Sequence, residues 1–234
     1  MLSDEGCKVV LLGETGVGKT SIIAQFMENE FSDDQPATTG ATFVSKSLHI
    51  RHVNKPLNFE IWDTAGQEKF RSLSKMFYKD SAVVILVYDI TNTKTFDELQ
   101  YYWINQIKEH APKKIIIAIA ANKSDLAKRE QVDEEQARLF ARNMGAIFKI
   151  TSAKNKTDIE DLFQEIGKCY YDPTFVYSNE ALEEDRNLSQ IRKASKRLQK
   201  EGTNDEKNFG SITGILYANY DLSGSLCRRI CIRN

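Results

Sequence analysis

The stretch Gly13-Glu14-Thr15-Gly16-Val17-Gly18-Lys19-Thr20 follows an apolar run and precedes a segment that can begin a helix. It has the pattern Gly-x-x-x-x-Gly-Lys-Ser/Thr, in which glycines let successive backbone N–H groups turn towards phosphate oxygens. A helix N-terminus at the same point adds partial positive charge. The stretch therefore predicts a phosphate-binding loop, in which Lys19 reaches the β- and γ-phosphates of a nucleotide and the Thr20 hydroxyl binds Mg²⁺. The nucleotide contacts predicted here are Gly13, Glu14, Thr15, Gly16, Val17, Gly18, Lys19, Thr20 and Ser21.

Strand-like stretches alternate with helix-like ones up to about residue 171. Near-continuous apolar runs are typical of buried parallel strands, and they occur at 7–12, 82–88 and 115–121, with a short last strand at 148–151. Residues 42–50 and 56–62 alternate in polarity around Asn54, which predicts an antiparallel hairpin at one sheet edge. We therefore predict an α/β fold whose six-stranded, mostly parallel sheet has one antiparallel edge strand.

Amphipathic stretches between these strands predict helices that cover both faces of the sheet. They are residues 19–28, 95–110, 134–144 and 157–171. Gly145 is expected to follow the end of the third helix. For the fourth, Thr157 is the expected N-cap, with Glu160 completing a capping box.

Composition sets limits on the class of protein. The chain has 234 residues, 41% of them hydrophobic, and a net charge of −1, so bulk charge gives no reason to expect a nucleic-acid partner. No apolar run approaches the roughly 20 residues that span a bilayer, and Leu2 excludes N-myristoylation. The four cysteines have neither zinc-site spacing nor a secretion signal beside them. We therefore expect a protein of the reducing cytosol.

The domain organisation follows from a change in composition at Asp172-Pro173. We expect residues 1–5 to be an N-terminal extension, 6–172 to be the globular domain and 173–234 to be a tail. The tail is acidic first and basic later, which is typical of a solvated segment that is partly helical or disordered.

A second group of residues completes the phosphate site. Asp63 ends an apolar strand, where a carboxylate can hold Mg²⁺. Gly66 places a backbone N–H near the γ-phosphate, and Gln67 can orient a water for in-line attack. The candidate catalytic residues are therefore Gln67, Lys19 and Gly66. The polar segment 31–40 offers Thr38 or Thr39 as a further hydroxyl for Mg²⁺.

A third group points to the base of the nucleotide. Asn122-Lys123-Ser124-Asp125 follows an apolar strand, at the sheet edge where ligands bind in open α/β folds. The Asp125 carboxylate can accept two hydrogen bonds from guanine, whereas adenine lacks that pair of donors. Asn122 can bind the purine and tie this loop to the phosphate-binding loop, and the stem of Lys123 can cover the base. Ser152-Ala153-Lys154 follows the last strand, where Ala153 N–H can meet guanine O6 and Lys154 can cover the ring.

These motifs, in this order and spacing, resemble those of the small GTPases of the Ras superfamily over residues 6–171. The resemblance implies a P-loop G domain that binds GTP and GDP with Mg²⁺, and it selects Thr38 as the switch threonine. The implied Mg²⁺ ligands are Thr20, Thr38 and Asp63. Phe31 matches the aromatic residue that packs against guanine.

Within the superfamily the chain is similar to Rab proteins. The stretches 61–68, 70–73 and 88–92 carry this likeness, while 38–43 and 72–78 lean towards endosomal members. The resemblance implies a switch in vesicle trafficking, and Phe43, Trp62 and Phe77 match the aromatic triad on which effectors dock. It also implies a GAP, an exchange factor and a dissociation inhibitor as partners. The expected protein is a monomer of the cytosol and of the cytoplasmic face of an intracellular membrane.

The chain departs from the family pattern in three places. Thr39 replaces an aliphatic residue, and Thr15 stands where Ras has its second P-loop glycine. The end Cys-Ile-Arg-Asn is not a standard prenylation box, because Arg233 stands where an aliphatic residue is expected. Cys231, together with Cys227, remains the candidate lipidation site.

Other functions share parts of this pattern. A P-loop ATPase or nucleotide kinase would not need the Asn122–Asp125 motif. A GTP-binding scaffold without useful hydrolysis would not need Gln67 together with Thr38. A Ras-type signalling GTPase outside the Rab group is the remaining alternative.

Overall fold

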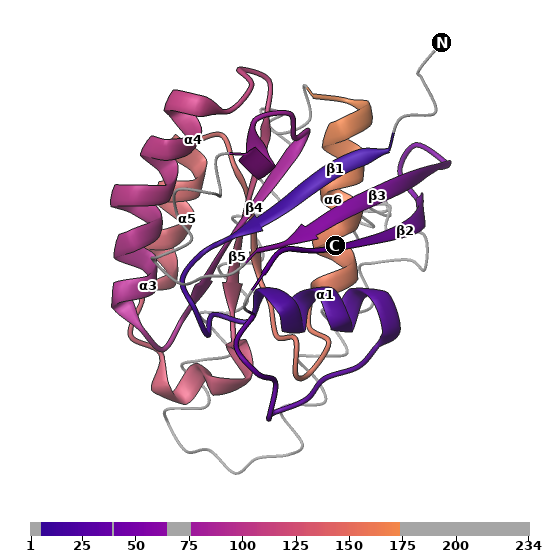
Figure 1. The fold of residues 1–234 in the computed structure, drawn as a ribbon. Helices are drawn as coiled ribbons and strands as arrows, with labels where there is room; N and C mark the ends of the chain where they lie inside the picture. Colours follow the sequence, from indigo (N-terminus) through magenta and orange to yellow (C-terminus); the bar gives the residue numbers. More distant parts are fainter. Residues whose placement is uncertain (1–5, 39, 65–75, 174–234) are drawn as a thin grey trace, which may run out of the picture. The chain divides into compact units, whose positions relative to one another are not determined.

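The computed structural model describes residues 6–38, 40–64 and 76–173 (Figure 1). The chain divides into two units, Met1–Leu182 and Glu183–Asn234, and the described residues all belong to the first. The expected boundary at 172/173 and the tail after residue 173 therefore stay predictions. No helix among the described residues is long and apolar enough to cross a membrane.

A six-stranded sheet forms the centre of this unit, in the order β2-β3-β1-β4-β5-β6. Its strands are β1 (Cys7–Leu12), β2 (Thr42–Ile50), β3 (Lys55–Asp63), β4 (Val83–Asp89), β5 (Ile116–Asn122) and β6 (Ile147–Ile150). Only β2 and β3 pair antiparallel, and the other four pairings are parallel. The predicted sheet is confirmed, including its antiparallel edge strand. All of β4 is buried, which explains why its sequence is a continuous apolar run up to Asp89.

Helices cover both faces of the sheet, as predicted (Figure 1). They are α1 (Lys19–Glu28), α3 (Thr93–Glu98), the π-helical η2 (Leu99–Trp103), α4 (Ile104–His110), the 3₁₀-helical η3 (Ser124–Arg129), α5 (Glu134–Asn143) and α6 (Ile159–Tyr171). The helices α1 and α6 pack on one face, and α3, η2, α4 and α5 pack on the other.

Two local predictions about the helices need correction. Residues 95–110 do not form one regular α-helix, because the π-helical turn η2 interrupts it. The capping box at Thr157 is wrong: α6 has Asp158 as its N-cap, and Thr157 instead exchanges backbone hydrogen bonds with Ser152. That bridge holds the loop after β6 and moves the start of the helix to Ile159.

Aromatic rings fill the core on each face of the sheet. Phe26 of α1 stacks on Phe163 of α6, with the ring centroids 3.7 Å apart, and both rings meet the edge of Phe59 from β3. On the other face, Phe96 of α3 packs between Tyr88 of β4 and Phe140 of α5. These ring contacts join α1 and α6 to β3 on one face of the sheet, and α3 and α5 to β4 on the other.

Two buried cysteines provide a test of this packing. Burial raises the pKa of the Cys7 thiol to about 12, with Glu60 adding to the shift, and burial raises the pKa of Cys169 to about 12 as well. At pH 8 a thiol with such a pKa is about 0.01% thiolate, which is the reactive form. We expect iodoacetamide at pH 8 to leave both cysteines unmodified in the native protein and to modify both in guanidinium, as read by peptide mass spectrometry. Rapid labelling of either one in the native protein would contradict the packing.

Candidate functional site

The loop between β1 and α1 has a backbone that depends on glycine. Gly13, Gly16 and Gly18 have positive φ angles of 143°, 76° and 96°. Gly18 is the N-cap of α1 and offers no side chain to the first N–H groups of the helix. A Cβ on Gly18 would also collide with the side-chain amide of Asn122. The first turn of α1 therefore presents backbone donors that a bound anion can satisfy.

Lys19 lies across this loop. Its Nζ donates to the carbonyl oxygens of Gly13 and Glu14, each at 2.9 Å. Burial lowers the pKa of Lys19 to about 8, although Asp63 and Glu14 act in the opposite direction. A phosphate group beside this amine would favour the charged form of Lys19. Burial disfavours the ammonium group in the protein alone, so a bound phosphate would supply the negative charge that it lacks.

Three oxygens gather at the start of α1, and they come from separate parts of the chain. Thr20 Oγ1 donates to Asp63 Oδ2 at 2.5 Å and lies 2.7 Å from Thr38 Oγ1. Among the described residues, Asp63 Oδ1 is buried without a hydrogen-bond partner. Burial raises the pKa of Asp63, and the contacts from Thr20 and Lys19 oppose the shift. Hard oxygen ligands of this kind, together with an orphaned carboxylate oxygen, fit Mg²⁺.

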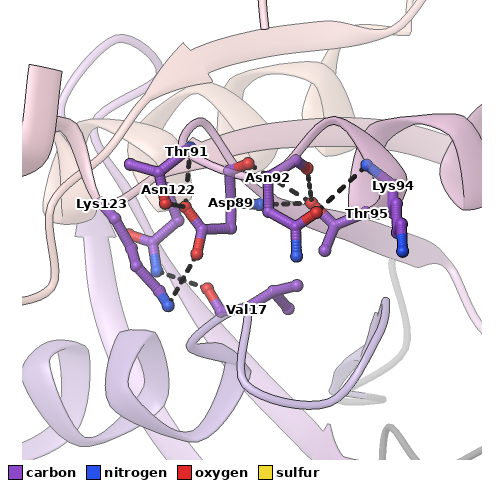
Figure 2. A network of polar contacts seen from close by, with 8 residues as sticks. All are labelled: Val17, Asp89, Thr91, Asn92, Lys94, Thr95, Asn122 and Lys123. Atoms are coloured by element: carbon purple, nitrogen blue, oxygen red, sulfur yellow. Dashed lines mark hydrogen bonds and ion pairs between the residues drawn. The ribbon is translucent and has the colours of Figure 1, made fainter. Parts of the chain in front are cut away.

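The loop after β5 is joined to the phosphate-binding loop. Asn122 Nδ2 donates to Val17 O at 2.8 Å (Figure 2), and Asn122 Oδ1 accepts from Thr151 Oγ1 at 3.2 Å. Asn122 is buried, so these contacts fix the distance between the base end and the phosphate end of the site. Asp125 is held by a hydroxyl, because Ser152 Oγ donates to Asp125 Oδ1 at 2.6 Å.

An ion pair between Lys154 and Asp33 lies at the end of the site where the base is expected. Lys154 Nζ lies 2.9 and 3.0 Å from the two carboxylate oxygens of Asp33 and 5.5 Å from the ring centroid of Phe31. The hydrogen bond to Asp33 raises the pKa of Lys154. This pair ties the segment after α1 to the loop after β6.

These parts enclose a cavity of about 420 Å³, within the range of sites that take small molecules. Its lining includes predicted contacts from the phosphate-binding loop and the start of α1, from the segment after α1, and from the loops after β5 and β6. They are Thr15, Gly16, Gly18, Lys19, Thr20, Ser21, Phe31, Thr38, Asn122, Lys123, Asp125, Ala153 and Lys154. The predicted Mg²⁺ ligand Asp63 of β3 is not part of the lining. Four other predicted contacts, Gly13, Glu14, Val17 and Ser152, contribute through the loop backbone or the hydrogen bonds above and are not part of the lining. Gly66 and Gln67 lie outside the described residues.

The aromatic triad forms a separate surface beside the site. Trp62 of β3 lies between Phe43 of β2 and Phe77, with ring centroids 5.2 and 5.7 Å apart. Phe43 is 49% exposed, which leaves this large apolar ring available for contact. The register pairs Phe43 with Trp62, so the hairpin itself brings the two rings together.

Sequence reasoning missed two carboxylates at this site. In the sequence, Asp33 is one residue of a polar segment, and its partner Lys154 lies 121 positions away, so nothing local indicates the pair. Asp89 pairs with Lys123 at 2.8 Å (Figure 2). A signal for Asp89 existed, because it ends an apolar strand just as Asp63 and Asn122 do.

Breaking the Asp33–Lys154 pair tests its part in retaining nucleotide. We expect Asp33→Asn to speed the release of a fluorescent GDP analogue by about two- to fivefold, because exposed pairs contribute little and salt screens them. Asp34→Asn is the matched control. Equal release rates for Asp33→Asn and Asp34→Asn would show that the pair does not matter.

Comparisons with known proteins agree with this geometry. The sequence model of the Ras family matches residues 8–172. Ras-related protein Rab-22A of Mus musculus is 46% identical over 161 residues, which make up 69% of this chain and 81% of that protein. Ras-related protein Rab-31 of Mus musculus is 44% identical over 168 residues, covering 72% and 85%. Ras-related protein Rab5 of Nicotiana tabacum is 40% identical over 161 residues, covering 69% and 79%.

These findings give no support to a P-loop kinase, a scaffold without hydrolysis or a signalling GTPase outside the Rab group. The match extends over the part of the chain that carries the phosphate, metal and base motifs. The chain therefore belongs to the Ras family of small GTPases, in its Rab branch, and is a GTP-hydrolysing switch of vesicle trafficking.

Proposed function

We propose that the cavity holds GTP with its phosphates on the loop 13–20. Its guanine is bound by Asp125 and by Ala153 N–H, and Lys154 covers the ring. The observation that carries this proposal is the meeting of Thr20, Thr38 and Asp63 oxygens, although they come from α1, the segment after it and β3. When bound there, Mg²⁺ neutralises charge on the β- and γ-phosphate oxygens.

The roles of individual residues follow from their positions. Lys19 holds the β- and γ-phosphates by charge. Gly66 N–H contacts the γ-phosphate, and Gln67 orients the attacking water. Ser21, Phe31 and the loop backbone position the nucleotide, so that hydrolysis depends on orientation and on charge stabilisation.

The switch depends on whether the third phosphate is present. Thr38 and Gly66 contact the γ-phosphate and thereby order the segments around them, and hydrolysis removes these contacts. Effectors read the ordered state through the surface of Phe43, Trp62 and Phe77, residues that flank both segments in the sequence. The family's regulators, namely a GAP, an exchange factor and a dissociation inhibitor, set the balance of the two states.

We propose that the protein acts as a monomer on the cytoplasmic face of an endosomal membrane. The sequences of 38–43 and 72–78 support this location, as does the likeness to Rab-22A, Rab-31 and Rab5. Attachment through lipid on Cys231, with Cys227 as the second candidate, rests on the sequence of the tail. Mass spectrometry of the C-terminal peptide from cells tests it, and an unmodified peptide in the membrane fraction would refute it.

Replacing Gln67 tests the catalytic assignment. We expect Gln67→Leu to slow single-turnover GTP hydrolysis by about tenfold or more while GTP binding stays within a factor of two, because leucine cannot orient water. The unstimulated wild-type rate should be on the order of 10⁻⁴ per second, as for Ras. Gln136→Leu, on the exposed side of α5, is the matched control. Unchanged hydrolysis in the Gln67 variant would remove this residue from the mechanism.

A further inference from the structure

Asp89 stands at the C-terminal end of β4, directly opposite Asn122 of β5 in the strand register. Ile90 N–H also donates to Asn122 O, so the two strand ends leave the sheet together. The Asp89 side chain is only 11% exposed. A carboxylate that is this well buried needs partners, and its partners show what it does.

Each oxygen of the Asp89 carboxylate has a different partner (Figure 2). Oδ1 accepts from the backbone N–H of Thr91 at 2.8 Å and from Thr91 Oγ1 at 2.7 Å. Oδ2 pairs with Lys123 Nζ at 2.8 Å. Burial acts to raise the pKa of Asp89, but the hydrogen bonds from Lys123 and Thr91 outweigh it and lower the pKa. The Asp89 carboxylate is therefore an anion held in place from two sides. Oδ1 faces the turn after β4, and Oδ2 faces Lys123 in the loop after β5, which we call the base loop.

The turn that carries Asp89 is itself held in place. Asp89 N–H donates to Thr95 Oγ1 at 3.0 Å, and Thr95 Oγ1 donates to Asn92 O at 2.7 Å. Asn92 caps α3 by accepting from Lys94 N–H. Figure 2 shows these contacts on the side of Asp89 away from Lys123. The carboxylate is thus anchored to the start of α3, independently of the base loop.

Lys123 needs such an anchor. Its backbone is left-handed, with φ of 67°, and its side chain lines the cavity two residues before Asp125. A lysine stem has four rotatable bonds, and an unpaired one samples many rotamers that a bound base would have to restrict. The Asp89 pair restricts them before the nucleotide arrives, which lowers the entropic cost of binding.

We propose that Asp89 is a positioning residue for nucleotide retention, acting through Lys123 by holding its side chain along the wall of the base pocket. This inference rests on the proposed function, because it takes the cavity to be the guanine-nucleotide site. It adds a residue of β4 to a site whose other described residues come from the loop after β1, from α1 and the segment after it, from the ends of β3 and β5, and from the loops after β5 and β6.

The test measures release of a fluorescent GDP analogue from the full-length chain. Asp89→Asn should speed release by about tenfold, because an amide can accept on one side only and cannot serve both Lys123 and Thr91. Lys123→Met should speed release to a similar extent. The double variant should release GDP within about twofold of Lys123→Met alone, because Asp89 has no other route to the nucleotide.

The control separates positioning from general damage to the turn. Thr95→Val removes the bond from Asp89 N–H but leaves the ion pair intact, so it should lower the melting temperature without changing GDP release by more than about twofold. If Asp89→Asn does not fold, Asp89→Ser takes its place in the same cycle, because its hydroxyl can meet Thr91 N–H and is too short to reach Lys123.

Two outcomes would overturn the inference: no effect of Asp89→Asn on release, or effects of Asp89→Asn and Lys123→Met that multiply. Failure of the proposed function looks different, because wild-type protein would then fail to prefer GDP over ADP. The inference can therefore fail while the guanine-nucleotide site stands.

Discussion

Asp125→Asn is expected to weaken GTP binding by about 100-fold or more and to give the protein measurable affinity for xanthosine triphosphate. The carboxylate can accept from both guanine N1–H and the exocyclic amine, whereas asparagine accepts on one side and donates on the other. Sites built to hydrogen-bond a substrate reject ligands that leave their polar groups unpaired. Xanthine has a carbonyl where guanine has its amine, so it matches the amide.

The structure makes this result interpretable because the change leaves the pocket intact. Asp125 accepts from Ser152 Oγ through Oδ1, and an amide oxygen at the same place can still accept this hydrogen bond. Competition binding with GTP, XTP and ATP provides the measurement, with Asp97→Asn on the exposed side of α3 as the matched control. Retained preference for GTP in Asp125→Asn would show that another residue reads the base.

Lys19→Ala is expected to lower GTP affinity by about 100-fold or more without lowering the melting temperature of the nucleotide-free protein. The lysine supplies a positive charge to the β- and γ-phosphates, and charge-assisted contacts of this kind are among the strongest in a binding site. The fold itself gains little from that charge, because burial lowers the pKa of Lys19 to about 8. Affinity and stability should therefore separate in this variant.

Isothermal titration with GTP and a thermal melt without nucleotide measure the two quantities. Lys113→Ala, which removes an exposed lysine between α4 and β5, should change neither. A large loss of stability in Lys19→Ala would mean that the contacts to Gly13 and Glu14 hold the loop together and that its loss of affinity is indirect. An unchanged affinity would refute the role of Lys19 outright.

The sheet and most helices could be predicted because burial on both sides imposes continuous apolar runs on parallel strands. The run ending at Asp89 is such a pattern, whereas the alternation before Asp63 is typical of a strand that is buried on one face only. Thr157 and Glu160 have the spacing of a capping box, but Thr157 instead closes the loop after β6 through its backbone bridge to Ser152, five residues earlier. The π-helical turn at Leu99–Trp103 leaves the amphipathic pattern almost unchanged, so periodicity alone could not reveal it.

The residues of the candidate site also fall into two groups, those that the sequence could predict and those that it could not. Motifs with fixed spacing, such as the loop ending in Lys19 and Thr20, carry their chemistry in a short stretch and could be recognised. Contacts between Asp33 and Lys154 or between Asp89 and Lys123 depend on which strand ends are neighbours. That information lies in the topology, and one sequence supplies it only after the fold is known.

The segment from Phe31 to Thr38 touches the rest of the protein at both ends of the cavity. Asp33 meets Lys154 at the base end, Gln35 meets Ser21, and Thr38 meets Thr20 beside the phosphates. A protein that binds this segment in the observed position therefore also raises nucleotide affinity, whereas one that pulls it away opens the base and phosphate ends together and lowers that affinity. By thermodynamic linkage, bound nucleotide raises the affinity for the first kind of partner by the same factor by which that partner raises nucleotide affinity, and the corresponding decrease holds for the second kind. Partners that change nucleotide affinity and partners that respond to the bound nucleotide can thus act on the same segment, Phe31 to Thr38. No second structural element is needed to couple the two events.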